Sequence, residues 1–241
     1  DRALREKVFH QFYQSFQSHI NTIAATYGTS VKKDVFYAKA RRYQSALDAA
    51  LSSDNVPESV YRDLIEKVHA HLPTMYRYVA LRKKILGIQQ LEMYDIYAPL
   101  VSQVDAKYTY EQAKELVLEG LSILGEEYLS HLREAFAGGW IDVFENKGKT
   151  SGAYSWGAYG THPYVLLNHR DDLDSVFTIA HELGHAMHSF YSDAAQPYPT
   201  AGYAIFVAEV ASTVNEILLT KHLLRTVQDP KLKKYILNHY I

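Results

Sequence analysis

The sequence predicts a mainly α-helical fold that includes one small β-hairpin or sheet. Apolar residues recur at three- and four-residue steps through most of the first 136 positions and again in the last third of the chain, which is the helical period. Two short segments, 151–156 and 164–168, have instead the composition of strands. With 241 residues, the chain has the length of one large domain or two small ones.

The first 136 residues are expected to form a helical scaffold. Interruptions of the helices are predicted at 27–30, 52–55, 72–73 and 87, and a less regular stretch at 94–107. Thr109 is expected to cap a further helix, with Gln112 at its third position. The apolar series at the start of the chain consists of Leu4, Val8, Phe12, Phe16, Ile20 and Ile23.

The helical pattern changes at Gly138 and Gly139, which predict a helix stop. The segments 151–156 and 164–168 then predict a hairpin or sheet just before the next helix. One interpretation is that the two strands only cap the helical core. The other is that the Gly- and Ser-rich first strand presents an open edge to which an extended peptide adds as another strand.

Two helices are expected in the last third of the chain, at about 174–191 and about 202–224. The second is also expected to carry a separate polar stripe of Glu209, Ser212 and Glu216, spaced i, i+3, i+7. The apolar residues expected to be buried are Val176, Ala180, Leu183, Met187 and Phe190 on the first helix, and Val207, Val210, Val214 and Ile217 on the second.

We therefore expect two regions, a helical scaffold at 1–139 and a metal-binding core at 140–241 that holds the sheet and these two helices. The chain lacks an initiator Met, and the residues before Ile241 stop inside a helical pattern. We expect an internal piece of a longer protein, truncated at the C-terminal end of the second region.

Composition excludes several classes of function. With 25 Lys and Arg against 27 Asp and Glu, the formal charge of −2 provides no electrostatic footprint for nucleic acid or an acidic membrane surface. No run approaches the roughly 18 apolar residues of a membrane span. The absence of cysteine rules out disulfides and leaves His and carboxylates as the strong zinc ligands, and it suits a cytoplasmic location.

The segment from His181 to His185, which reads His-Glu-Leu-Gly-His, combines metal-binding and catalytic residue types. On a helix, His181 and His185 lie on one face with Cβ atoms roughly 6 Å apart, which suits a single zinc ion. Glu182 is turned aside from that pair, so it can contact an activated water without occupying a metal position. Gly184 either lets a neighbouring backbone or a substrate approach the metal, or is a tolerated helix glycine packed against another element.

A catalytic zinc site needs a third protein ligand. A metzincin would require Gly and His where this chain has His188 and Tyr191, and His188 lies roughly 10 Å further along the helix axis than His181. Glu209, near the start of the next helix, is the better candidate. From the sequence alone, however, it is equally well interpreted as a solvated acid on the helix surface. Glu216 is a candidate to hydrogen-bond a metal-binding imidazole, or else it faces solvent.

These residues predict one zinc ion per chain, at a site that would also accept cobalt or manganese. Zinc lowers the pKa of a water molecule toward about 7 from roughly 15.7, and Glu182 would take the proton as general base. The reaction class that follows is hydrolysis of a peptide bond. The alternatives are a helical peptide-binding or scaffold fragment with a structural or empty metal site, and a metallohydrolase of non-peptide substrates.

The segments 181–189 and 206–213 together resemble the oligoendopeptidase F family, which belongs with thimet oligopeptidase among the zinc oligopeptidases. The similarity extends to 94–100 and 149–154, and so covers most of the chain. It implies a zincin-like helical metallopeptidase domain with a deep channel, cytoplasmic cleavage of short unstructured peptides, Glu182 as general base and Glu209 as third zinc ligand. It also implies that the strand at Gly152, Ala153 and Tyr154 lies along the substrate.

One departure from the family pattern has a consequence for activity. In that family a later helical region supplies a His and tyrosines that stabilise the tetrahedral intermediate, and these have no counterpart before Ile241. The resemblance therefore predicts that residues 1–241 alone bind metal and hydrolyse peptides poorly.

Overall fold

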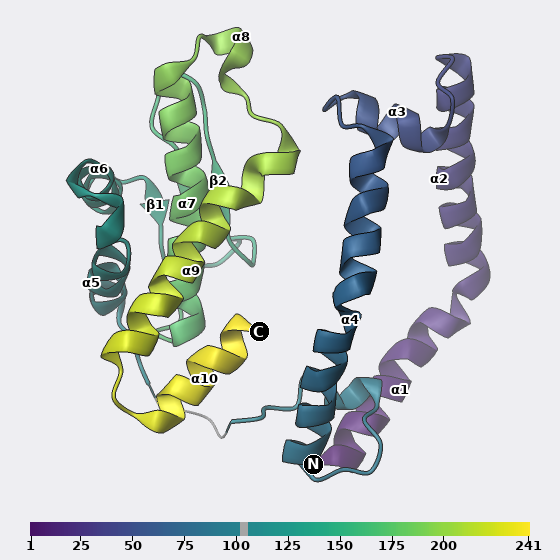
Figure 1. The fold of residues 1–241 in the computed structure, drawn as a ribbon, viewed down its shortest axis with the longest axis horizontal. Helices are drawn as coiled ribbons and strands as arrows, with labels where there is room; N and C mark the ends of the chain where they lie inside the picture. The colour runs from purple at the N-terminus through teal and green to yellow at the C-terminus, as the bar shows by residue number, and fades with distance from the viewer. Residues whose placement is uncertain (102–105) are drawn as a thin grey trace. The chain divides into compact units, whose positions relative to one another are not determined.

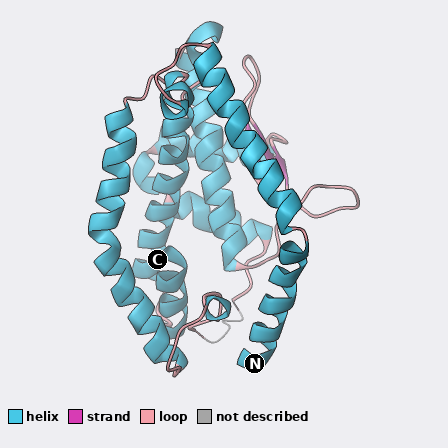
Figure 2. Ribbon diagram, turned by 90° about the vertical axis from the view of Figure 1, so that its right-hand side faces the viewer, coloured by secondary structure: helices cyan, strands magenta, loops and turns pink. Residues whose placement is uncertain are grey.

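The computed structural model describes residues 1–101 and 106–241, so part of the stretch expected to be irregular, 102–105, lies outside the described residues. The chain divides into two compact units, 1–100 and 101–241. Helices dominate both, and the strands of the described residues form one small sheet (Figure 2). The predicted mainly helical fold class is confirmed. None of the helices in the described ranges combines the length and apolar character of a membrane-spanning helix.

The first unit is an assembly of long helices joined by short turns. In Figure 1, α1 and α2 follow one another, α3 crosses at one end, and α4 returns. Its elements are α1 (Arg2–Ser18), α2 (Ile20–Ala40), α3 (Ala46–Ser52), α4 (Glu58–Leu86) and the 3-10 turn η1 (Met93–Asp95).

Two of the predicted interruptions in the first unit are wrong. Helix α2 continues through Gly28 and α4 continues through Pro73. A single helical glycine costs only about 1 kcal/mol, and the long helix flanking Pro73 on both sides outweighs one lost backbone hydrogen bond. The predicted breaks at 52–55 and at Gly87, which ends α4 with a φ of +66°, are confirmed.

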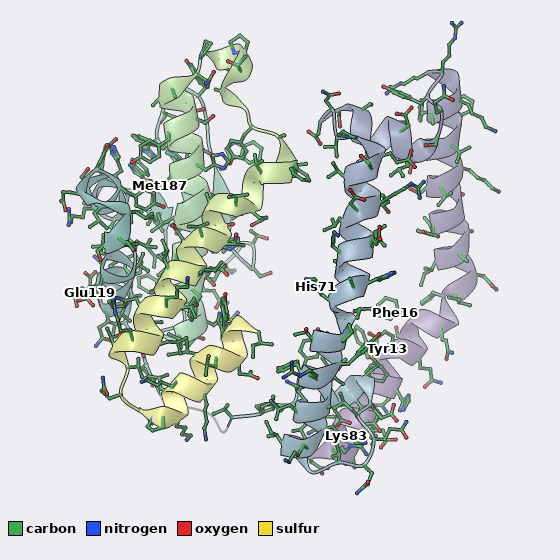
Figure 3. The ribbon with its side chains drawn as sticks, in the orientation of Figure 1. Tyr13, Phe16, His71, Lys83, Glu119 and Met187 are labelled. Carbon is green, nitrogen blue, oxygen red and sulfur yellow. The ribbon has the colours of Figure 1, made fainter. Side chains whose placement is uncertain are left out.

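A cluster of charged groups joins η1 to α1 at one end of the first unit. The fully buried Asp95 carboxylate accepts hydrogen bonds from Arg2 and Arg5, at 3.0 Å from the Nη2 atom of each. Arg82 donates to the carbonyls of Asp95 and Ala98. Apolar residues of the same unit remain exposed: Tyr13 and Phe16 of α1, labelled in Figure 3, are about half accessible. The whole expected apolar series, which runs from Leu4 on α1 to Ile23 on α2, is 40–59% exposed within the described residues.

The second unit is built around helix α7. In Figure 1, α9 crosses α7 diagonally, with α5 and α6 beside them. Met187 of α7, labelled in Figure 3, belongs to their shared core. The elements are α5 (Tyr110–Gly120), η2 (Ser122–Leu124), α6 (Glu126–Ala137), β1 (Ile141–Asp142), β2 (Tyr154–Trp156), β3 (Tyr164–Leu166), α7 (Leu173–Ala195), α8 (Tyr198–Ala201), η3 (Ile205–Val207), α9 (Ala208–Thr226) and α10 (Pro230–Tyr240).

The contact boundary at 100/101 differs from the expected boundary at 139/140, because α5 packs on α7 and α9, and α6 packs on α7. The predicted cap at Thr109 is confirmed, since its hydroxyl accepts from the backbone N–H of Gln112. The predicted helix stop is also confirmed: α6 ends at Ala137, and Gly139 follows with a φ of +76°.

The sheet precedes α7 as predicted, with one strand more than the two expected. Its order is β1-β3-β2, with β1 parallel and β2 antiparallel to β3, so that β2 is an edge strand. The residues before Tyr154 do not extend the strand, because Gly152 turns the chain with a φ of +86°. β1 was not predicted, since two residues are too few to show an alternating pattern.

Most of the face of α9 that was predicted to be buried is exposed. Val207, Val210 and Val214 are 38–58% exposed and Ile217 is partly buried, whereas Ser212 and Asn215 are buried. The apolar stripe expected to pack inward is therefore mostly open within the described residues, and the polar stripe packs on α7. On α7 the prediction is confirmed: Val176, Ala180, Leu183 and Met187 are buried and Phe190 is partly buried.

Candidate metal centre

Helix α7 presents His181 and His185 from its middle turns. Its first turn is fixed by Asp172, whose carboxylate accepts from the backbone N–H of Ser175 at 2.8 Å. The two side chains, 27% and 17% exposed, lie one turn apart with their Nε2 atoms 3.1 Å from each other. The apolar face of α7 is buried in the core, so the imidazoles are directed away from it toward α9.

Helix α9 approaches α7 closely where both lack large side chains. A Cβ atom added to Gly184 would lie 2.6 Å from the Cα atom of Ser212 and 2.8 Å from the carbonyl oxygen of Ala211. Gly184 is therefore packed against the backbone of α9, a close approach that fits both interpretations of this glycine. Glu209 lies on the same helix, one turn before Ser212.

Glu209 completes a group of three donors. Its Oε2 atom lies 3.4 Å from Nε2 of His181 and 3.3 Å from Nε2 of His185. Ser212 donates from its hydroxyl to the same carboxylate oxygen at 2.7 Å. This hydrogen bond is the largest cause that holds the pKa of Glu209 below its ordinary value, and the two imidazoles act in the same direction. The carboxylate is therefore ionised and ready to bind a cation.

The separations between the three donors fit zinc. Ligand atoms at 2.0–2.1 Å from a tetrahedral zinc ion are about 3.3 Å apart, and the three observed edges are 3.1, 3.3 and 3.4 Å. The Glu209 side chain is 66% exposed, so the solvent side of the group remains accessible to a fourth ligand. Two imidazoles and one carboxylate with an open position are a donor set of catalytic zinc sites.

Glu216 contacts the other nitrogen of His181. Its Oε1 atom lies 2.5 Å from Nδ1 of His181, which donates the hydrogen bond. That bond assigns the proton to Nδ1 and leaves the lone pair of Nε2 directed at the three-donor group. A carboxylate in this position orients a metal-binding imidazole and increases its basicity.

Glu182 is buried beside the same group. Burial raises the pKa of Glu182, with the charges of Glu209 and Glu216 acting in the same direction and His181 opposing them. Burial also lowers the pKa of His185, which favours the neutral imidazole that binds metals. His188 does not join the donor group: it stacks on Tyr203 with ring centroids 3.7 Å apart.

The edge strand β2 runs alongside the part of α7 that carries the histidines. A cavity of about 200 Å³ at its start is lined by Ala153 and by Ile179, and at its end a Cβ atom on Gly157 would lie 2.6 Å from Cβ of Ser189. His181 and His185 fall between Ile179 and Ser189. Sequence reasoning assigned substrate contacts to Gly152, Ala153 and Tyr154, and the structure places them at the start of this edge.

The pairing of the sheet determines which backbone groups of β2 face outward. Val165 and Leu167 of β3 donate to β1, so the alternate residues Tyr164 and Leu166 direct their N–H and C=O groups at β2. Their partners are Trp156 and Tyr154, whose backbone groups are therefore used within the sheet. The backbone groups of Ser155 then point to the open edge. Sequence reasoning missed Ser155, because strand register cannot be read from one strand alone.

Comparison with known proteins agrees with this geometry. The sequence profile of peptidase family M3 matches residues 1–241. The chain is 49% identical over its full length to oligopeptidase PepF of Bacillus subtilis and 46% identical to group B oligopeptidase PepB of Streptococcus agalactiae, of which it covers 36% and 40%.

Two solved structures also cover the whole chain. A crystal structure from Chlamydophila abortus has a TM-score of 0.88 at 40% identity, and oligoendopeptidase-F from Enterococcus faecium has a TM-score of 0.69 at 36% identity. The chain spans 40% and 35% of those two proteins. Since the family profile matches it from end to end, the chain belongs to peptidase family M3.

Proposed function

We propose that this chain carries the zinc-binding part of an endopeptidase that hydrolyses short oligopeptides, using metal-activated water and a glutamate general base. The observation that carries the proposal is the group of His181, His185 and Glu209, whose three donor atoms have the spacing of zinc ligands beside the buried Glu182. The names of its relatives, oligopeptidase and oligoendopeptidase, support the substrate class.

The residues of the site take distinct roles in the proposal. His181, His185 and Glu209 hold one zinc ion, which when bound polarises the peptide carbonyl and activates a water molecule. Glu182 accepts the proton of that water and delivers it to the nitrogen of the departing amine. Its raised pKa makes it a better proton acceptor than an exposed glutamate, because a general base works best when its pKa approaches the operating pH.

The edge of β2 supports binding of an extended peptide. The outward backbone groups of Ser155 would pair with the peptide main chain, as in β-strand addition. Main-chain pairing tolerates many side chains, which suits an enzyme acting on varied short peptides. Tyr154 and Trp156, 49% and 69% exposed, offer aromatic surface next to that edge. A peptide on this edge would run beside the turns of α7 that hold His181 and His185.

A Glu182→Gln variant tests the proposal, made in a form of the protein that also carries the later helical region of the family, because residues 1–241 alone are expected to hydrolyse peptides poorly. We expect about one zinc per chain in both the variant and the unmodified protein, measured by metal analysis, and a loss of cleavage of a mixed peptide pool by roughly 10²–10⁴-fold. Glu127→Gln, at an exposed glutamate of α6, is the matched control and should cleave normally.

The results separate the alternatives. Unchanged cleavage in Glu182→Gln would remove Glu182 from the mechanism. Zinc without cleavage of any peptide in the unmodified protein would favour a peptide-binding or scaffold function with a structural metal. Absence of zinc after incubation with the metal would remove the site itself.

A further inference from the structure

We propose that Asn215 is a positioning residue that sets the register of α9 on α7, and so brings Glu209 and Glu216 to the imidazoles. The inference rests on the proposed metal site. Asn215 lies one residue before Glu216, and its side chain is directed into the interface between helices rather than at the donor group.

The Asn215 side chain joins three helices through its amide. It is 1% exposed, and its Nδ2 atom donates to the carbonyl oxygen of Ala180 on α7 at 3.0 Å. The hydroxyl of Tyr128, on α6, lies 2.9 Å from Nδ2 and 3.1 Å from Oδ1 of the same amide. Burial raises the pKa of Tyr128 to about 12, so the hydroxyl keeps its proton. The network is neutral and its members are mutually satisfied.

This hydrogen bond lies next to the contact that orients His181. Asn215 bonds to Ala180, and the following residue of each helix forms the pair of Glu216 and His181. A slide or rotation of α9 on α7 that broke the first contact would therefore displace the second. Because hydrogen bonds weaken steeply with distance and angle, the amide fixes the helix more sharply than apolar contact does.

One part of the contact between α7 and α9 has no interlocking side chains. There Gly184 lies against the backbone of Ser212. Side chains on a helix lean toward its N-terminus, so the side chain missing at Gly184 is also the one that would cover the Ala180 carbonyl. That carbonyl thereby keeps a lone pair accessible to Asn215.

An Asn215→Leu variant of the protein tests the inference, with Leu219→Ala as matched control. Leu219 lies one turn further along α9, is fully buried and packs on Gly120 of α5, so its truncation loosens the core without touching the amide. The measurements are the zinc dissociation constant from competition with a chelator, the visible absorption spectrum after cobalt replaces zinc, and the thermal midpoint.

We expect Asn215→Leu to weaken zinc binding roughly 10–100-fold, the range found when groups that orient metal ligands are removed, and to alter the cobalt spectrum. Leu219→Ala should lower the thermal midpoint at least as much and leave both metal readouts unchanged. Tyr128→Phe, which removes one member of the network and keeps the bond to Ala180, should change them in the same direction by a smaller factor.

If Asn215→Leu, like Leu219→Ala, left the zinc affinity and the cobalt spectrum unchanged, the inference would be overturned. Asn215 would then have a merely structural role. If Asn215→Leu does not fold, Tyr128→Phe decides the question: wild-type zinc affinity with an unaltered spectrum overturns the inference, and a shift in both supports it. Failure of the unmodified protein to bind zinc would instead remove the metal site on which the inference rests.

Discussion

Replacing Gly184 with alanine should clearly weaken metal binding while it weakens the fold only modestly. The new Cβ would lie 2.6 Å from Cα of Ser212, whereas ordinary contacts are 3.4–4 Å, so the two helices must separate by about 1 Å at this point. Glu209 lies less than one turn from Ser212 and moves with it. Zinc sites tolerate errors of about 0.2 Å in ligand distance, so a shift of this size removes Glu209 from the donor group or strains it.

The stability change of Gly184→Ala is the difference of two opposing effects. Overpacking costs about 1–3 kcal/mol, and replacing a helical glycine by alanine returns about 1 kcal/mol. The net loss of about 0–2 kcal/mol lowers the thermal midpoint by only a few degrees. Zinc affinity should fall at least about tenfold, which corresponds to roughly 1.4 kcal/mol.

The assay compares Gly184→Ala with Gly28→Ala by chelator competition and by thermal unfolding with and without zinc. Gly28 is inside α2, and no atom lies within 4 Å of the added Cβ, so alanine there should stabilise the protein slightly and leave zinc binding unchanged. Wild-type zinc affinity in Gly184→Ala would refute the reasoning, since it would show that Glu209 reaches the metal without the close approach of the helices.

Three further predictions follow from the two units. Glu216→Gln should weaken zinc binding about 10–100-fold in chelator competition, since the neutral amide orients His181 less strongly; an unchanged dissociation constant would contradict this role. Asp95→Asn should destabilise the first unit by roughly 1–3 kcal/mol in denaturant unfolding, because it removes the charge that Arg2 pairs with; a midpoint within error of the unmodified protein would argue against it. The arginine contacts lower the pKa of Asp95 to about 2. The stabilising effect of the carboxylate is therefore complete above the unfolded pKa of 3.8 and is lost as the pH falls toward 2. Between these two pH values, the stability of Asp95→Asn should depend less on pH than that of the unmodified protein.

The parts of this protein that follow from local pattern were predictable from its sequence. Any helix brings His181 and His185 to the same face, because they are four residues apart, and the apolar stripe of α7 predicts that helix. Thr109 and Gly87 specify helix ends through their own hydrogen bonding and backbone conformation. The helix breaks predicted at Gly28 and Pro73 were wrong, because one glycine or proline interrupts a long helix only weakly.

The parts that depend on contacts between distant segments were not predictable in the same way. The backbone groups of Ser155, rather than those of Tyr154, face the edge of the sheet. This follows from the register of β2 on β3 and from which residues of β3 pair with β1. For Glu209, the spacing alone left a metal ligand and a solvated acid equally plausible, and the resemblance to a family favoured the ligand. Its position beside the histidines depends on the packing of α9 against α7.

The polar face of α9 that packs on α7 explains why the metal site and the core are hard to separate in this unit. The stripe that meets α7 carries Glu209, Ser212 and Glu216, and buries Ser212 completely. Large apolar side chains would hold the helices too far apart for the donor atoms to come within 3.4 Å of each other, so the contact has to be made by small and polar groups. The part of the contact around the donor atoms therefore buries little apolar area and contributes little to stability on its own. We therefore expect bound zinc to contribute substantially to the stability of this helix pair, in proportion to the logarithm of its concentration over its dissociation constant. A thermal midpoint that did not rise with added zinc would show that the folded protein does not bind the metal in preference to the unfolded chain, and would contradict the metal site.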